Sequence, residues 1–187
     1  VHALHKAVWT GETGDPNTAN KMIVWGGSGT SNNAGYYSDA EGGSWVNISS
    51  TNAPTSRTYH TALWTGTDML VWGGVISITP TNTGGKYNFA SDTWSTMATL
   101  NAPSARTEHT AVWTGDTGDP DTANRMIVWG GKSSTYYNTG AIYNSATNVW
   151  SPITVTSAPS ARTGHSAIWT GSKMIVWGGN AARVGRA

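Results

Sequence analysis

The six residues "MIVWGG" at positions 22–27 recur at 126–131 and 174–179, and "MLVWGG" occupies 69–74. The tryptophans of successive copies lie 47, 57 and 48 residues apart. The longer spacing has one source, because segments 12–21 and 116–125 are eight residues longer than their counterparts in the second and fourth copies. The underlying unit is therefore about 48 residues, and such regular self-similarity is the signature of a repeat architecture.

Each unit contains four short stretches with the pattern of β-strands. In the second unit these stretches are "YHTALW" (59–64), "DMLVWGG" (68–74), "GGKYNF" (84–89) and "DTWSTM" (92–97). The first alternates with period two, and the second is an apolar run ended by two glycines that can adopt positive φ. No stretch has helical periodicity. Four antiparallel strands in about 48 residues predict a propeller blade, which needs a neighbour on each side to bury its faces.

The repeated marks resemble those of kelch repeats, in which a double glycine ends the second strand, a Tyr lies on the third and a Trp on the fourth. The double glycines are Gly26-Gly27, Gly73-Gly74, Gly130-Gly131 and Gly178-Gly179. Tyr and Trp stand seven residues apart at Tyr87 and Trp94 and at Tyr143 and Trp150, whereas Ser38 precedes Trp45 by seven. The chain looks most like the Thr- and Trp-rich kelch arrays of bacterial exported proteins.

This resemblance implies an all-β kelch-type β-propeller or a segment of one, with a galactose-oxidase-like fold. The copper site of galactose oxidase depends on a Tyr crosslinked to Cys, and this chain has no Cys, so that activity is not expected here. The sequence also lacks a nucleophile elbow, a zinc-protease motif and a phosphate loop. We therefore expect a protein that is not an enzyme and that needs no cofactor.

The composition excludes several classes of partner. Charged residues make up 11% of the chain, the formal net charge is +1, and no run of Lys or Arg exceeds two residues. Nucleic-acid binding is not expected, because it requires a basic surface. The apolar runs are too short to cross a membrane. The absence of Cys leaves the compartment open, while the resemblance to exported arrays implies an extracellular or cell-surface location.

Tryptophan and histidine recur at fixed positions of the unit. All eleven tryptophans fall at the "WTG", "VWGG" or fourth-strand position, which predicts that they form the core between blades rather than a sugar-binding surface. His5, His60, His109 and His165 each stand four residues before the "WTG" tryptophan. We expect these imidazoles to hydrogen-bond the neighbouring strand, because no cluster with metal-ligand spacing accompanies them.

Two further sets of residues are candidates for binding a ligand. Arg57, Arg106 and Arg162 recur three residues before the histidines, where they could form interblade ion pairs or bind a ligand anion. Asp116, Asp119 and Asp121 lie in the long loop of the third unit and are weak calcium candidates. Asp-Pro-Asn and Asp-Pro-Asp are also ordinary turn formers, and that interpretation is favoured.

The loops after the double glycines differ between units and carry the remaining candidate residues. In the second unit these are Val75, Ile76 and Ile78, and in the third they are Lys132, Tyr136 and Tyr137. We expect these loops to gather on one face with the linkers that join the units. Apolar and aromatic side chains at positions that packing does not demand indicate a binding surface. The alternative is that these loops vary in sequence without a binding role.

The sequence thus predicts one propeller domain, or part of one, over residues 1–187. The blades are expected at about 1–50, 51–100, 101–156 and 157–187, and the last is half a blade because its Tyr and Trp hairpin is missing. Open blade edges predict either a homo-oligomer or further blades of a larger propeller. The expected function is that of a non-catalytic extracellular interaction or scaffold module for a protein or glycan partner. The alternative is a lectin-like or carbohydrate-active propeller.

Overall fold

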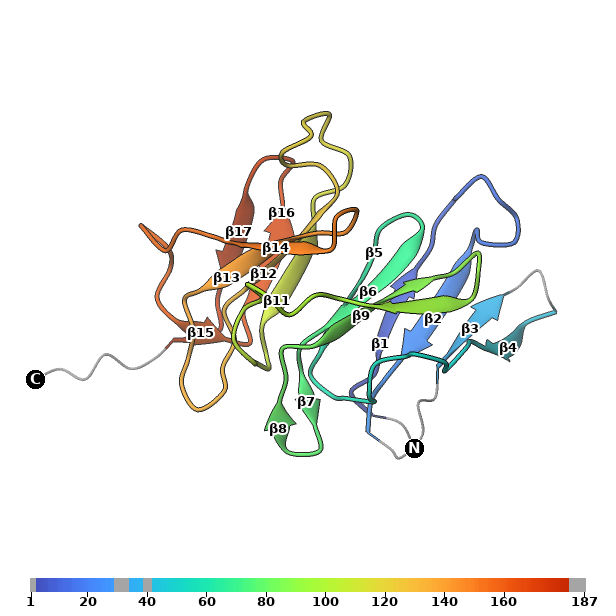
Figure 1. Ribbon diagram of the computed structural model, residues 1–187, viewed down its shortest axis with the longest axis horizontal. Helices are drawn as coiled ribbons and strands as arrows, with labels where there is room; N and C mark the ends of the chain where they lie inside the picture. Colours follow the sequence, from blue (N-terminus) through green and yellow to red (C-terminus); the bar gives the residue numbers. More distant parts are fainter. Residues whose placement is uncertain (1–2, 29–33, 39–41, 182–187) are drawn as a thin grey trace, which may run out of the picture.

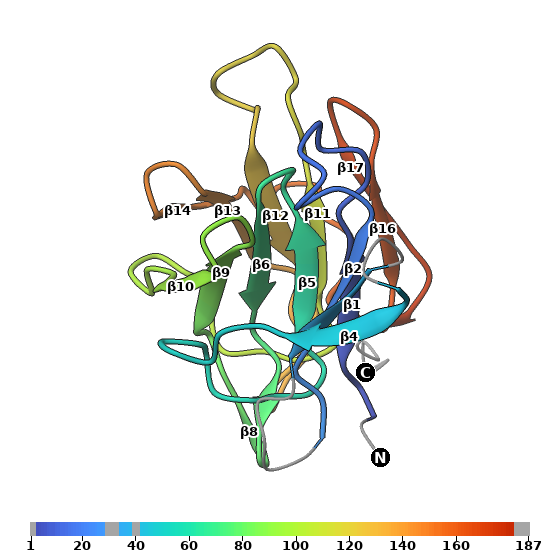
Figure 2. The same cartoon turned by 90° about the vertical axis from the view of Figure 1, so that its right-hand side faces the viewer.

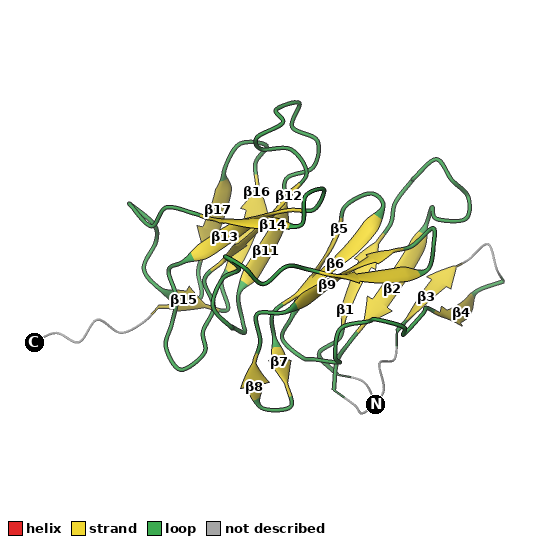
Figure 3. Ribbon diagram, viewed as in Figure 1, coloured by secondary structure: helices red, strands yellow, loops and turns green. Residues whose placement is uncertain are grey.

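The computed structural model describes residues 3–28, 34–38 and 42–181, which form strands and loops without a helix (Figure 3). Three four-stranded sheets and one two-stranded sheet follow one another along the chain, from blade 1 in blue to blade 4 in red (Figure 1). The all-β propeller segment predicted from the repeats is therefore confirmed. Within these residues no membrane-spanning helix is found.

Each complete blade is an antiparallel meander of four strands. Blade 1 consists of β1 (Lys6–Trp9), β2 (Lys21–Trp25), β3 (Gly35–Ser38) and β4 (Ser44–Asn47). Blade 2 consists of β5 (Thr61–Trp64), β6 (Asp68–Trp72), β9 (Gly84–Asn88) and β10 (Thr93–Thr96). Blade 3 consists of β11 (Thr110–Trp113), β12 (Arg125–Trp129), β13 (Gly140–Asn144) and β14 (Val149–Pro152). Among residues 157–181, blade 4 consists of β16 (Ser166–Trp169) and β17 (Met174–Trp177).

Two short strand pairs lie outside the blades. β7 (Val75–Ile76) pairs with β8 (Thr79–Pro80) in a hairpin, and β15 (Arg162–Thr163) pairs with β18 (Asn180–Ala181). Both pairs are antiparallel, and both are formed by segments that follow a double glycine or precede a blade.

The strand register corrects one detail of the sequence interpretation. Ser38 does not occupy the Tyr position of the first blade, because Tyr37 pairs with both Met22 and Trp45. The hairpin after β3 is one residue longer than that after β9, so Tyr and Trp are eight residues apart in blade 1. The Tyr mark is therefore present in all three complete blades, although a fixed spacing of seven could not find it.

The core lies between neighbouring blades rather than within any one of them. The innermost strands β1, β5, β11 and β16 are in contact from each blade to the next. In β6, Met69 and Val71 pack towards blade 1, whereas Leu70 and Trp72 pack towards blade 3. All four side chains are fully buried, because a strand covered on both faces needs apolar residues at every position.

The fourth strand of one blade is tied to the blade before it. The indole of Trp94 packs against Trp25 with ring centroids 5.6 Å apart, and its Nε1 donates to Ser49 O at 2.9 Å. Asp92 Oδ1 accepts hydrogen bonds from Ser49 N and from Tyr87 Oη, both at 2.7 Å. In blade 3, Trp150 and Asn148 repeat these contacts with blade 2.

The prediction that every tryptophan is interblade core is wrong for three of the eleven. Trp9, Trp45 and Trp177 are 55%, 57% and 81% exposed. Each lies in the first or the last blade and faces the side on which no described blade packs. Their exposure follows from their place in the row of blades and not from a different local structure.

Loops leave the blades at two opposite ends. The β7–β8 hairpin projects from the lower end in Figure 1, and the loop of residues 114–124 projects from the upper end. The view in Figure 2, turned by 90°, shows the same separation. We call the lower end the β7–β8 face; it comprises the hairpin, the loop 132–139 and the interblade linkers 52–58 and 101–107.

Candidate functional site

The linkers and the variable loops meet at the β7–β8 face, as the sequence predicts. Thr58 and Val75 exchange two backbone hydrogen bonds, of 3.0 and 2.8 Å. Thr107 and Lys132 do the same in the next blade, at 2.8 and 2.9 Å. Each variable loop is therefore held on the linker that enters its own blade, which gives this face a fixed backbone.

An open groove of about 930 Å³ lies on this face between blades 1 and 2. It is lined by Ser50, Thr55, Ser56, Thr58, Val75 and Ile76, among others. Hydroxyl groups from the linker thus face apolar side chains from the β7 strand. A concave site of this size with mixed lining is suited to a bound segment or small ligand.

Among the sequence-predicted residues, Ile78 projects furthest into solvent. It lies in the two-residue turn between β7 and β8, and 92% of its surface is exposed. Ser77 precedes it with φ of +56°, a left-handed conformation that a tight hairpin turn requires. Val75 and Ile76 are half-buried and line the groove. The hairpin therefore presents an apolar tip beside an open groove.

Arg57 also lines the groove, but its guanidinium holds the backbone of its own blade. The residue is 2% exposed. Its Nε donates to Thr55 O at 2.9 Å, and its Nη1 donates to Thr83 O at 2.8 Å and Gly73 O at 3.3 Å. Burial lowers the pKa of Arg57 to about 10, so the group stays charged at neutral pH. No carboxylate of the described residues lies within ion-pair distance of it.

The other two arginines make equivalent bonds. Arg106 is buried and donates through Nη1 to Gly130 O at 2.9 Å and Thr139 O at 2.8 Å. Arg162 donates to Gly178 O at 2.9 Å in the half blade, where it is more exposed. The three arginines thus tie each linker to the double glycine of the same blade, and they form no interblade ion pair among the described residues.

Tyr137 lies directly on one of these arginines. The guanidinium carbon of Arg106 is 4.4 Å from the centroid of the Tyr137 ring. The Tyr137 hydroxyl is 2.7 Å from Ser133 Oγ, within the same loop. The structure therefore places Tyr137 against the body of the protein, where it gives the loop a fixed position by cation–π contact.

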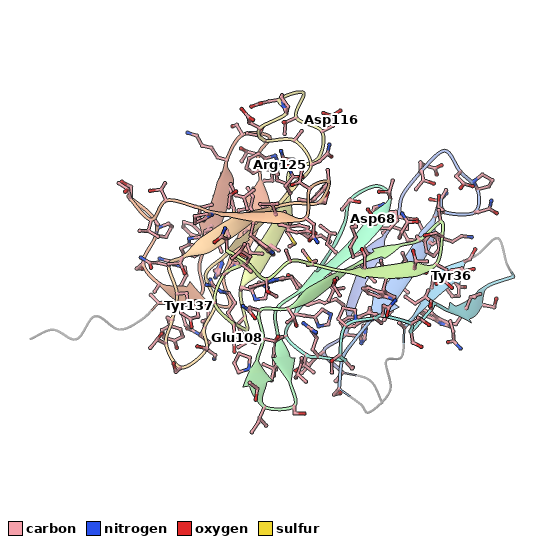
Figure 4. All side chains as sticks on the ribbon, in the orientation of Figure 1. Tyr36, Asp68, Glu108, Asp116, Arg125 and Tyr137 are labelled. Atoms are coloured by element: carbon pink, nitrogen blue, oxygen red, sulfur yellow. The ribbon has the colours of Figure 1, made fainter. Side chains whose placement is uncertain are left out.

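Tyr136 and Lys132 lie further out on the same loop. Tyr136 is 37% exposed. Lys132 Nζ forms an ion pair with Glu108 Oε1 at 2.7 Å, and the hydrogen bond that Lys132 donates to this carboxylate raises the pKa of Lys132. Figure 4 shows Glu108 and Tyr137 together at the β7–β8 face, away from Asp116 and Arg125 at the opposite end.

The sequence interpretation missed the residue that precedes each histidine. Leu4, Tyr59, Glu108 and Gly164 all have positive φ, between 55° and 64°. Tyr59 and Leu4 are nearly half exposed. A non-glycine residue in this conformation is strained, and such strain is often found at binding sites. A signal was present, because this position differs in every unit although its neighbours repeat.

The histidines pack between blades. The predicted hydrogen bond to the neighbouring blade forms at His109 and His165, each to a threonine hydroxyl. It does not form at His60, whose ring nitrogens have no hydrogen-bond partner among the described residues, because Lys6 stands where the later blades have that threonine. The ring of His60 stacks edge-on against Trp25 at 5.2 Å, and that of His109 against Trp72 at 5.1 Å. His109 Nε2 lies 3.1 Å from Thr61 Oγ1 on the neighbouring blade. Burial, reinforced by nearby Arg side chains, lowers the pKa of His60 to about 4 and of His109 to about 3. Both imidazoles are therefore neutral at physiological pH.

The three weak calcium candidates lie at the opposite end of the molecule. Asp116 Oδ1 accepts from Gly118 N at 3.0 Å, and Asp119 Oδ1 accepts from Asp121 N at 2.9 Å. These are hydrogen bonds of the turn type that the sequence favours. In the described part of the chain, no group of three or more acidic or histidine side chains is gathered in a way that could hold a metal ion.

The fold and this face define a class: a segment of a β-propeller that offers a structured loop surface. A family model, the KLHDC2/KLHL20/DRC7 Kelch-repeats domain, matches residues 86–186, which is more than half of the chain. The chain belongs to the Kelch-repeat family. Kelch domains are in general protein-interaction modules and are typically not catalytic. A search of curated proteins finds no match.

Proposed function

We propose that this Kelch segment is a non-catalytic extracellular module that binds a protein partner through the β7–β8 face. The single observation that carries the proposal is the open groove of about 930 Å³ beside the apolar tip at Ile78. An isoleucine exposed to 92% gains binding energy only when another molecule covers it. The fixed backbone of the linkers lowers the entropy lost on binding.

The lining of the groove indicates the chemistry of the partner. The linker offers hydroxyl groups, β7 offers aliphatic side chains, and the buried Arg57 supplies a positive charge beneath them. An extended segment with an apolar anchor and neutral or acidic neighbours would fit this combination. We infer the extracellular location from the resemblance to exported arrays.

A glycan is the second candidate ligand. Tyr59 and Tyr136 expose aromatic rings on the same face as the Ser and Thr hydroxyls of the groove. Aromatic faces with nearby hydroxyl groups suit sugar rings, so both classes of ligand can be compared on one surface.

The test is a selection of binding peptides from a random library, run in parallel with a glycan array. We expect peptides whose binding weakens about 30-fold in Ile78→Asp, because burial of one Ile side chain is worth about 2 kcal/mol. Val149→Asp is the matched control, since Val149 is 50% exposed on the outer strand β14, outside this face.

Mapping the chemical-shift changes of the protein on peptide binding locates the binding site independently. Perturbations confined to residues 50–58 and 75–80 would support the proposal. Selected peptides that perturb only the opposite end, or that bind Ile78→Asp as well as wild type, would overturn it. Binding by sugars alone would replace the protein partner with a glycan.

A further inference from the structure

Neighbouring blades meet through one repeated contact. The tryptophan that ends the second strand of a blade stacks on the histidine of the next blade, and the first glycine after it makes room for that ring. A Cβ built on Gly26 would lie 2.7 Å from His60 Cε1, and one on Gly73 would lie 2.6 Å from His109 Cε1. At Gly130 the distance to His165 Cε1 is 2.5 Å. The same two blade faces, one with the tryptophan and glycine and the other with the histidine, therefore pack together three times within one chain.

The outward face of blade 4 carries the tryptophan and glycine side of this contact, and none of the described residues packs against it. Ile168, Ile175 and Trp177 are 60%, 49% and 81% exposed. In blade 2 the counterparts of Ile175 and Trp177, Leu70 and Trp72, are fully buried against blade 3, and the counterpart of Ile168, Leu63, is partly buried there. A Cβ built on Gly178 meets no atom within 4 Å, so the space that holds a histidine ring at the other three glycines is empty here.

The outward face of blade 1 carries the histidine side of the same contact. An open groove of about 560 Å³ there is lined by His5, Ala7, Met22, Val24, Gly35 and Trp45, among others. His5 stands at the repeat position of His60, and Trp45 at that of Trp94. In blade 2, the equivalents of Met22 and Val24 are Met69 and Val71, which are fully buried.

We infer that these two faces bind each other between copies of this chain, head to tail, with Trp177 of one copy against His5 and Trp45 of the next. The three internal interfaces supply the template for every contact. Apart from the His5 imidazole, the named residues carry no ionisable side chain, so no charge has to be buried. This surface lies on the sides of the terminal blades and is separate from the β7–β8 face.

A head-to-tail contact differs from a symmetric one, because it uses a different patch on each partner. Such heterologous contacts generate closed rings or open chains. We therefore expect the mass of the particle to exceed the 19.7 kDa of one chain and, if the contact does not close, to rise with concentration.

Sedimentation velocity on the 187-residue chain and two single variants tests the inference. Trp177→Asp removes only the blade 4 face and Trp45→Asp only the blade 1 face, so each variant alone should be monomeric at concentrations where wild type associates. Mixed together, the two variants should form a 1:1 dimer, since each keeps the face that the other lacks. Ile78→Asp, on the β7–β8 face, should associate like wild type.

A wild-type chain that stays monomeric from low to high micromolar concentration would overturn the inference. So would two variants that remain monomers when mixed, because the mixture still offers one intact copy of each face and the proposed contact should form. Both tryptophans are already exposed, so near-ultraviolet circular dichroism should show native spectra. The milder Trp177→Ser and Trp45→Ser pair repeats the mixing experiment if either aspartate variant fails to fold.

Discussion

The buried histidines predict that this fold loses stability in mild acid. In an unfolded chain a histidine has a pKa of about 6.5, whereas in the folded chain the pKa is lowered to about 4 at His60 and about 3 at His109. Between these values the unfolded state binds protons that the folded state excludes. Stability is therefore complete above about pH 6.5 and falls as the pH drops below it.

The size of the loss follows from the shifts. At about pH 4.5 each of the two histidines costs about 2 to 3 kcal/mol, so together they cost about 5 kcal/mol. A loss of this size is comparable to the total stability of many domains.

Urea unfolding followed by tryptophan fluorescence at about pH 7 and about pH 4.5 measures the effect. His60→Gln and His109→Gln should each remove about half of the loss calculated for this pair, whatever they do to the stability at neutral pH, while His165, whose pKa burial also lowers, keeps its own share. A change in the free energy of unfolding below about 1 kcal/mol between the two conditions would refute the argument. So would a wild-type dependence that both variants retain in full.

Three further predictions concern the ties within and between blades. Gly74→Ala should destabilise the fold by about 2 kcal/mol more than Gly66→Ala in urea unfolding, since both have positive φ but only a Cβ at Gly74 would meet Thr58 O, at 2.4 Å. Asp92→Ala should cost about 1 to 2 kcal/mol, whereas Asp92→Asn should be nearly neutral, because an Asn makes the same two bonds in blade 3. Arg106→Met should lower the free energy of unfolding by about 3 kcal/mol and Arg162→Met by less, because only Arg106 is buried. Equal effects of the two members of any pair would contradict the corresponding contact.

The repeats were sufficient to predict the strands of the blades and their order, but not the β7–β8 hairpin or the β15–β18 pair. A glycine pair, a tryptophan and a histidine at fixed intervals indicate that the blades share the same packing. The exposure of Trp177 and Trp45 could not be predicted in this way, because a repeat describes the position of a residue and not whether a neighbour covers it. Tyr37 was missed for a related reason, since one extra hairpin residue shifts the spacing without changing the register.

The candidate site was predicted in part. The loops that carry Ile78 and Lys132 do meet the linkers at one face. The hydrogen bonds of Arg57 and Arg106 to loop carbonyl groups could not be predicted. Every residue has a backbone carbonyl group, and an arginine can bind a ligand as well as a carbonyl group. The positive φ of Tyr59 was missed because nothing in the chemistry of a tyrosine side chain indicates this conformation.

Blade 2 is the one blade of the described structure with a four-stranded sheet on each side, and both hydrophobic clusters share its β6 strand. In a linear array of this kind, each unit is stabilised chiefly by its nearest neighbours. The two terminal sheets each have one such neighbour, so local opening begins there and proceeds inwards. Amide hydrogens of β6 will then be the slowest to exchange with solvent, and those of β17 among the fastest. Local opening is therefore rarest in the central blade and most frequent at the two terminal faces, where another blade could pack.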